Sequence, residues 1–212
     1  SPRRQRQMCI RDSPYAVIIK NNKDLIHDAR KSWDFLLSKK LKGKIIFPKS
    51  PRIIMSISKK ISAKDSLSKL KGQAMLFDDQ NSINWLINSQ ANVAIVPYSQ
   101  CVKYMKVDSR LSIVFPKKGV PLIWYFLLSN SKVHNQNLID WINSFENRIT
   151  IDKLANQGWY LPFKSEYTQS KYSTSSKNIN FGPSKLCWEN SWSLSPINKK
   201  EKFNLENFWN QT

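Results

Sequence analysis

The residue types that most often perform catalysis or bind metals are few in this 212-residue chain, and they are scattered. Cysteine occurs at Cys9, Cys101 and Cys187 without a CxxC pair, and histidine occurs only at His27 and His134. A zinc site or a disulfide framework needs several ligands at characteristic spacings, so neither is predicted. We expect isolated thiols that are buried or incidental, and histidines that ligate nothing.

The sequence also lacks the short motifs that place a reacting group in position. It contains no glycine-rich phosphate loop, no nucleophile elbow and no HExxH helix. The one adjacent acidic pair is Asp78-Asp79, which we interpret as the cap of a helix at Asn81 rather than as an acid–base pair. The sequence therefore predicts a protein that is not an enzyme and that uses no metal or cofactor.

Basic residues outnumber acidic ones by 34 to 15, which gives a net charge of +19 and a pI near 9.9. Such an excess is typical of proteins that bind nucleic acid, where clustered cations release counterions from the phosphates. Here the lysines occur in ones and twos, as at Lys39-Lys40 and Lys59-Lys60, among Asn, Ile and Ser. We therefore favour a dispersed, solvated surface and expect no nucleic-acid partner. The alternative, a basic nucleic-acid-binding domain, predicts a contiguous Lys/Arg face with exposed aromatic side chains.

Residues 1–12 have no periodicity and resemble translated sequencing-adapter sequence, so we treat them as a non-native tail. A native basic arm is the alternative. Without the four Arg and one Asp of this segment, the charge changes from 34 − 15 = +19 to 30 − 14 = +16. The chain has no apolar leader and no run of about 18 apolar residues. If the tail is foreign, the true start of the protein is missing, and the lack of a leader does not bear on location.

Short apolar runs alternate with segments of helical spacing along most of the chain. Apolar, β-branched runs predict strands, and apolar residues at every third or fourth position predict helices. Such alternation is typical of an α/β fold with a mostly parallel sheet that is covered on both faces. The strands are predicted at 15–19, 44–47, 74–77, 93–96, 112–115 and 121–128, and the helices at 25–38, 51–61, 65–71, 80–89, 100–105, 137–145, 151–156 and 204–209.

Several strings, taken in order, resemble one protein family. SWDFLL with LKGKI at 32–45 is similar to SWxDLL…LKGKI, PKSPR at 48–52 to PDSPR, and FPKKG at 115–119 to IPKEG. The helix at 137–144 and the corner GWYLP at 158–162 follow in the same order. Together they resemble the type II periplasmic binding proteins of the spermidine/putrescine group.

This resemblance implies a two-lobed trap that closes on a small solute, serves the membrane permease of an ABC importer and lies in the periplasm. It also implies an N-terminally truncated fragment with one nearly complete lobe and a piece of the other. On this mapping the second lobe comprises residues 13–123. Residues 124–162 return to the first lobe, and residues 163–212 form a loop and a short helix on the second lobe.

The resemblance also implies where a solute would bind. Polyamine sites pair carboxylates with ammonium groups and line the methylene chain with aromatic rings. The family's acids are missing, because the PKSPR loop that contains Ser50 carries no acid, Ile53 stands at a second acidic position, and Phe126 stands at the Asp of the Trp-x-Asp motif. We therefore hypothesise a neutral or anionic solute in place of a polyamine. The ligand-binding residues carried over from the family are Ser50, Arg52, Tyr98, Ser99, Trp124 and Tyr125.

Two of these residues have an alternative interpretation. Arg52 can bind a carboxylate or phosphate through two hydrogen bonds, or it can tie the start of its own helix to a loop. For Trp124, which lies in an apolar run, packing in the core is favoured over stacking on a ligand.

Overall fold

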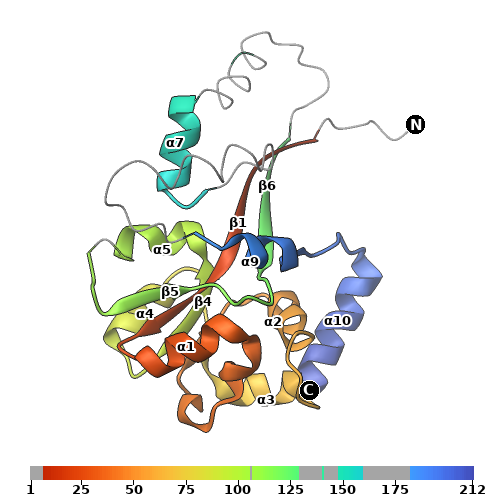
Figure 1. Cartoon of the computed structure of the whole chain (residues 1–212). Helices are drawn as coiled ribbons and strands as arrows, with labels where there is room; N and C mark the ends of the chain where they lie inside the picture. The colour runs from red at the N-terminus through yellow and green to blue at the C-terminus, as the bar shows by residue number, and fades with distance from the viewer. Residues whose placement is uncertain (1–6, 106, 129–139, 141–147, 160–181) are drawn as a thin grey trace. The chain divides into compact units, whose positions relative to one another are not determined.

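The computed structural model describes residues 7–105, 107–128, 140, 148–159 and 182–212 of the chain (Figure 1). The chain divides into two compact units. Unit 1 comprises residues 1–13 and 123–181, and unit 2 comprises residues 14–122 and 182–212. The polypeptide therefore passes between the units at three places, after residues 13, 122 and 181.

Seven strands form the sheet, in the order β3-β2-β4-β1-β6-β7, with β5 also paired to β1. All six strands predicted from the sequence are present. The first is longer than predicted, because β1 begins at Gln7, inside the segment interpreted as a non-native tail. The strands are β1 (Gln7–Lys20), β2 (Ile45–Phe47), β3 (Ala74–Phe77), β4 (Val93–Pro97), β5 (Leu111–Val114), β6 (Pro121–Leu128) and β7 (Trp192–Ser193).

The sheet is mixed, whereas the sequence predicted a mostly parallel one. Strand β2 is parallel to β3 and β4, but β1 is antiparallel to both β4 and β5. The reason lies between β1 and β2. The predicted helix at 25–38 is instead α1 (Lys23–Lys31) followed by two 3-10 helices, Trp33–Leu37 and Lys39–Leu41. These bring the chain back to the start of β4, where β1 also ends, so β2 runs opposite to β1.

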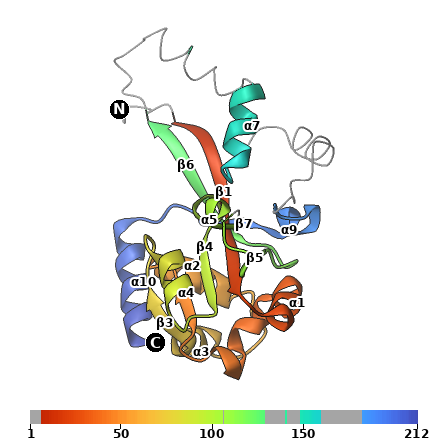
Figure 2. The same cartoon turned by 90° about the vertical axis from the view of Figure 1, so that its left-hand side faces the viewer.

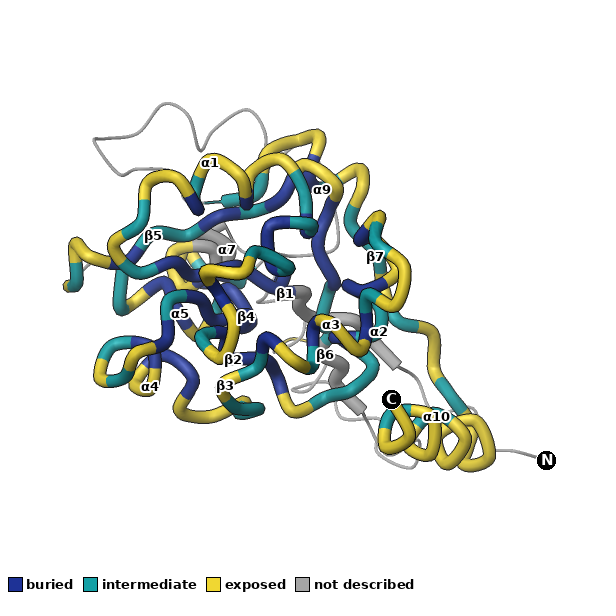
Figure 3. The backbone as a smooth tube through the Cα atoms, turned by 90° about the horizontal axis from the view of Figure 1, so that it is seen from below, coloured by how far each residue is buried: buried dark blue, intermediate teal, exposed yellow. Residues whose placement is uncertain are grey.

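The core of unit 2 lies along its central strands. The side chains of residues 16–19 in β1, 45–47 in β2 and 93–95 in β4 are fully buried. Strands that are buried on both faces carry continuous apolar runs instead of alternating ones, which is the pattern that identified them in the sequence. Figure 3 shows these strands in the interior, with exposed positions on the surrounding helices.

Two helices of unit 2 begin at residues that commonly start helices. Asn22 accepts a hydrogen bond from the Leu25 N–H and so caps α1. Pro51 occupies the first turn of its helix, where a missing N–H costs nothing. The helices of unit 2 after α1 are α2 (Pro51–Ser58), α3 (Ser66–Gln73), α4 (Ser82–Asn88), α5 (Tyr98–Met105), α9 (Lys185–Asn190) and α10 (Lys199–Gln211).

Asp34, in the SWDFLL string, joins three parts of unit 2. Its carboxylate accepts hydrogen bonds from the Ser32 hydroxyl at 2.7 Å and the Ser62 N–H at 2.8 Å, and it pairs with Lys118 at 3.0 Å. Burial alone would raise the pKa of Asp34, but these hydrogen bonds outweigh it and lower the pKa to about 2. The neighbouring, fully buried Trp33 donates its ring N–H to the Gly119 carbonyl at 2.9 Å. The family-like string is thus a structural junction.

Gly119 is required by its backbone conformation and by its surroundings. Its φ of +85° is one that other residues rarely adopt, and a Cβ there would lie 2.0 Å from the Asn190 carbonyl oxygen. Asn190 ends α9 and donates its side-chain amide to the Lys117 carbonyl at 2.9 Å. The turn before β6 is therefore packed directly against the end of α9.

Helix α10 of the C-terminal segment packs against the β3 edge of the sheet, whereas β7 lies at the opposite end of the strand order. Strand β7 pairs in parallel with the first residues of β6, and α10 extends the helix predicted at 204–209 in both directions. The Trp209 ring contacts Phe77 of β3 edge-on at 5.7 Å, and Lys71 donates to the Trp209 carbonyl at 2.7 Å. Figure 2 shows α10 beside this edge. Neither α9 nor β7 was predicted from the sequence.

Unit 1 contains the first part of β1, most of β6, and α7 (Arg148–Asn156). Helix α7 includes the helix predicted at 151–156, and Gly158 follows it with φ +82°, as expected for a glycine at a helix end. Of the helix predicted at 137–145 only Asp140 is described, and the loop predicted at 168–180 lies outside the described residues. Nowhere in the described parts of the chain is a helix both long enough and apolar enough to cross a membrane.

Candidate functional site

The carboxyl ends of β2, β3 and β4 meet at one edge of the sheet, because these three strands are parallel. Each of them leads directly, or after a short turn, into a helix: β2 into α2, β3 into α4 and β4 into α5. In open α/β sheets this edge collects helix starts and polar loop residues, and it is where ligands bind. This edge, called the carboxyl edge below, is therefore the candidate ligand site of unit 2.

Two of these loops are joined by hydrogen bonds from the main chain. The Lys49 N–H, after β2, donates to the Asp79 carboxylate at 3.0 Å, and the Asp78 N–H donates to the Phe47 carbonyl at 2.9 Å. Asp79 and Lys49 are exposed. The structure therefore puts one exposed cation and one exposed carboxylate on adjoining loops at the carboxyl edge.

Asp78 does not cap α4, which corrects the sequence-based interpretation of the Asp78-Asp79 pair. Helix α4 begins after Asn81 without a side-chain cap, and the Asp78 carboxylate instead accepts the Gln80 N–H at 2.9 Å and the Trp85 ring N–H at 3.1 Å. The Gln80 N–H is the main cause of a lowered pKa for Asp78. Burial opposes it, and Asn81, Trp85 and Lys49 add to the lowering. Asp78 is thus ionised and already hydrogen-bonded within its own turn.

Ser50 and Arg52 lie at the start of α2, on the same edge. Ser50 is half-buried and precedes the helix, but its side chain does not cap it. The Arg52 guanidinium donates to the main-chain carbonyl of Ser195. This contact agrees with the second interpretation of Arg52, in which the arginine ties the helix start to a loop.

Tyr98 and Ser99 form the first turn of α5. Tyr98 is buried, and its ring packs edge-on against Phe115 at 5.4 Å, so it belongs to the interior of unit 2. Ser99 is half-buried on the same turn. The nearby Cys101 is free and buried, and burial raises the pKa of its thiol.

Trp124 and Tyr125 lie in β6, beyond the point where the chain passes into unit 1. Trp124 is half-buried. The six residues carried over from the family are thus divided, with Ser50, Arg52, Tyr98 and Ser99 in unit 2 and the other two in unit 1.

Lys49 and Asp79 were not singled out from the sequence as site residues. The signal was present, because each follows a predicted strand within two residues, and parallel strands end at the same edge. The family motifs drew attention to Ser50 and Arg52 instead.

Among the comparisons with known proteins, only the one with solved structures finds similar chains. No protein-family model matches the chain, and neither does any curated protein. Among solved structures, it is similar to the spermidine/putrescine ABC transporter substrate-binding protein of Streptococcus pneumoniae, at 13% identity and a TM-score of 0.72, over 97% of this chain and 68% of that one. It is also similar to a putative spermidine/putrescine ABC transporter from Listeria monocytogenes, at 17% identity and a TM-score of 0.66, over 97% and 68% of the two chains. The chain has the type II periplasmic binding fold.

This type II periplasmic binding fold is the one that the ordered motifs predicted. A ferric binding protein from Campylobacter jejuni shares it more distantly, at 15% identity and a TM-score of 0.53, over 73% of this chain and 57% of that one. Within the described residues of this chain, no group of three or more His, Cys, Asp or Glu side chains is placed to hold a metal ion. His27 is exposed on α1, and Cys187 is buried and free.

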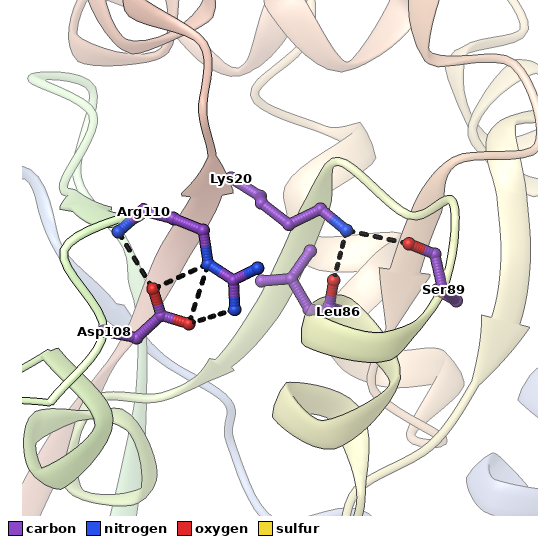
Figure 4. A network of polar contacts seen from close by, with 5 residues as sticks. All are labelled: Lys20, Leu86, Ser89, Asp108 and Arg110. Carbon is purple, nitrogen blue, oxygen red and sulfur yellow. Dashed lines mark hydrogen bonds and ion pairs between the residues drawn. The ribbon is translucent and has the colours of Figure 1, made fainter.

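The opposite edge of the sheet carries a second polar network in this periplasmic binding fold (Figure 4). Lys20, at the end of β1, donates to the Leu86 and Ser89 carbonyls, both at 2.7 Å, and so satisfies the last turn of α4. Arg110 binds Asp108 through its guanidinium and its N–H, and these hydrogen bonds lower the pKa of Asp108 to about 2. The network lies at the amino ends of β2 and β4, on the side of the sheet opposite the carboxyl edge.

Proposed function

We propose that this protein is the extracytoplasmic solute-binding component of an ABC importer, and that it binds a small solute without changing it chemically. The observation that carries this proposal is the likeness of fold, which extends over 97% of the chain. The carboxyl edge of unit 2 supports it, because loops and helix starts from three parallel strands gather there. The proposed partner is the membrane permease of the importer, and the proposed location is the periplasm.

We propose that unit 2 is one lobe of the binding protein and that unit 1 is a piece of the other. The resemblance had assigned residues 13–123 and 163–212 to the second lobe, while unit 2 comprises residues 14–122 and 182–212. The N-terminal part of the first lobe would then be encoded upstream of residue 1. Sequencing the DNA upstream of residue 1 should then reveal a reading frame that encodes a leader and an α/β half-lobe.

The charges at the carboxyl edge favour an anionic or neutral solute over a polyamine. The edge carries Lys49, and Arg52 stands in the first turn of α2, whereas Asp78 is hydrogen-bonded within its own turn. Asp79 is exposed there, but it already accepts the Lys49 N–H. A polyamine would leave ammonium groups desolvated with too few partners, at a cost of several kcal/mol per ion. We propose Lys49, Ser50 and Ser99 as the solute contacts of unit 2.

A panel of solutes tests this proposal. Titration calorimetry and thermal shift would compare spermidine, citrate, inorganic phosphate and glucose. We expect an anion or the sugar to bind and raise the melting temperature, and spermidine to have no effect. Lys49→Met should weaken binding of an anion about tenfold, because it removes a charged hydrogen-bond donor. Lys59→Met, which removes an exposed lysine just after α2, is the matched control and should change nothing.

Two outcomes would contradict the proposal. Binding of spermidine alone would restore the polyamine as solute and refute the argument from the missing acids. Tight binding of duplex DNA with a steep dependence on salt would favour the nucleic-acid-binding alternative, which gains no support from the comparisons.

A further inference from the structure

Arg52 is hydrogen-bonded to a distant part of its own chain. Its guanidinium extends from the first turn of α2 to the Ser195 carbonyl, 143 residues further along the sequence. Ser195 belongs to the short connection between β7 and α10. The arginine therefore links the loop that precedes α2 to the C-terminal segment.

The same segment is bonded to β6. The Trp192 N–H donates to the Val120 carbonyl at 3.1 Å, and the Val120 N–H donates to the Ser191 hydroxyl at 3.2 Å. Beyond these bonds, Pro121 pairs with Trp192 and Leu122 with Ser193. Residues 191–195, which we call the linking segment, thus connect the first residues of β6 to Arg52.

A second contact holds α2 along the linking segment. The Lys60 ammonium, just beyond the end of α2, lies 4.9 Å from the centre of the Trp192 ring, within reach of a cation–π interaction. Both ends of α2 therefore contact the linking segment, Arg52 at Ser195 and Lys60 at Trp192. The helix and the segment thus contact each other at two points.

The linking segment contacts β6 just before this strand leaves unit 2. Strand β6 passes from unit 2 into unit 1 immediately after Leu122, the last residue paired with β7. We propose that Arg52 is a positioning residue, which couples the Lys49–Ser50 loop to β6 through the linking segment and does not itself contact solute. The role of this coupling in solute binding rests on the function proposed above. The coupling itself does not.

Hydrogen exchange on the full chain, without solute, tests the coupling. Arg52→Met removes the donor and keeps most of the side-chain length, whereas Arg52→Lys keeps one donor. In Arg52→Met we expect amide exchange to rise about threefold to tenfold at residues 191–195 and also at Val120, as for the loss of a charged hydrogen bond. Arg52→Lys should stay within about twofold of the wild type, since it can still reach the carbonyl. Lys59→Met, at the other end of α2, is the control.

A double-mutant cycle separates coupling from general loss of stability. Ser191→Ala removes the acceptor for the Val120 N–H at the other end of the linking segment. If the segment connects the two ends, the effects of Arg52→Met and Ser191→Ala on exchange are not additive. Additive effects, or a rise confined to residues 50–54, would overturn the proposal. A uniform rise over the whole chain would do so as well.

The two proposals fail in different ways. If the solute panel finds no ligand but exchange is coupled as expected, the mechanical link stands and the transport function does not. The other outcome is that a solute binds, that both Arg52→Met and Arg52→Lys weaken its binding, and that exchange at Val120 is unchanged. Arg52 would then contact the solute directly, and the coupling would be refuted.

Discussion

Asp34 is the carboxylate whose surroundings make the clearest prediction about pH. Its pKa in the folded protein is about 2, below the ordinary value of 3.8, so its contribution to stability is complete above pH 3.8 and is lost as the pH falls through 2. We expect Asp34→Asn to lower the free energy of unfolding by about 0.5–1 kcal/mol at neutral pH, since the pair with Lys118 is partly exposed. The difference from the wild type should shrink between pH 4 and pH 2, as denaturant titrations at each pH would measure.

Asp28→Asn provides the control for this prediction. Asp28 forms an ion pair with Lys31 at 3.7 Å, and both side chains are mostly exposed, so little change is expected at any pH. A difference between Asp34→Asn and the wild type that stays constant down to the pKa of about 2 would contradict the role assigned to the charge of Asp34.

Individual contacts were harder to predict than the positions of the residues that make them. The motif PKSPR placed Ser50 and Arg52 correctly at the start of a helix after a strand, because Pro51 and the apolar spacing signal that start. The partner of Arg52, the Ser195 carbonyl, cannot be read from a motif, since any exposed main-chain carbonyl is chemically equivalent. Tyr98 shows the same limit, because whether its ring faces solvent or Phe115 depends on packing.

At the scale of the turns, Gly119 and Gly43 can be compared directly. Both have positive φ, but only at Gly119 would an added Cβ collide with the neighbouring backbone. We expect Gly43→Ala to cost about 1–2 kcal/mol, from the backbone conformation alone. Gly119→Ala should cost clearly more, because α9 must also move. Urea denaturation of the two variants would measure this, and equal losses would show that the turn before β6 is not packed as described.

The secondary structure could be predicted to the extent that it depends on local pattern. Continuous apolar runs identified β2 and β4, whereas the helix predicted at 25–38 is interrupted at Ser32, which caps a 3-10 helix. The direction of β1 was not predictable in this way, because it depends on how the chain returns between Trp33 and Leu41. Strand β7 has two residues and is defined only by its pairing with β6, so it leaves no periodic signal.

The molecule as a whole carries a net charge of +19, which predicts how its stability responds to salt. Repulsion among the cations opposes folding and is screened as the Debye length falls from ~30 Å at ~0.01 M to ~8 Å at ~0.15 M salt. We expect the melting temperature to rise by a few degrees over this range. Lys39→Gln with Lys40→Gln, at two exposed positions, should reduce the rise. A melting temperature that falls with salt would mean that ion pairs outweigh the repulsion.

Unit 2 is assembled from two stretches of chain, 14–122 and 182–212, which the β6–β7 pairing and the contact of Gly119 with α9 hold together. Since residues 123–181 belong to unit 1, we expect a single protease cut within them to break the covalent link between the two stretches without separating them. The nicked protein should therefore travel as one species on a gel-filtration column and separate only in denaturant. If the two stretches are expressed from separate genes, the fragments should associate, as the parts of a split reporter do.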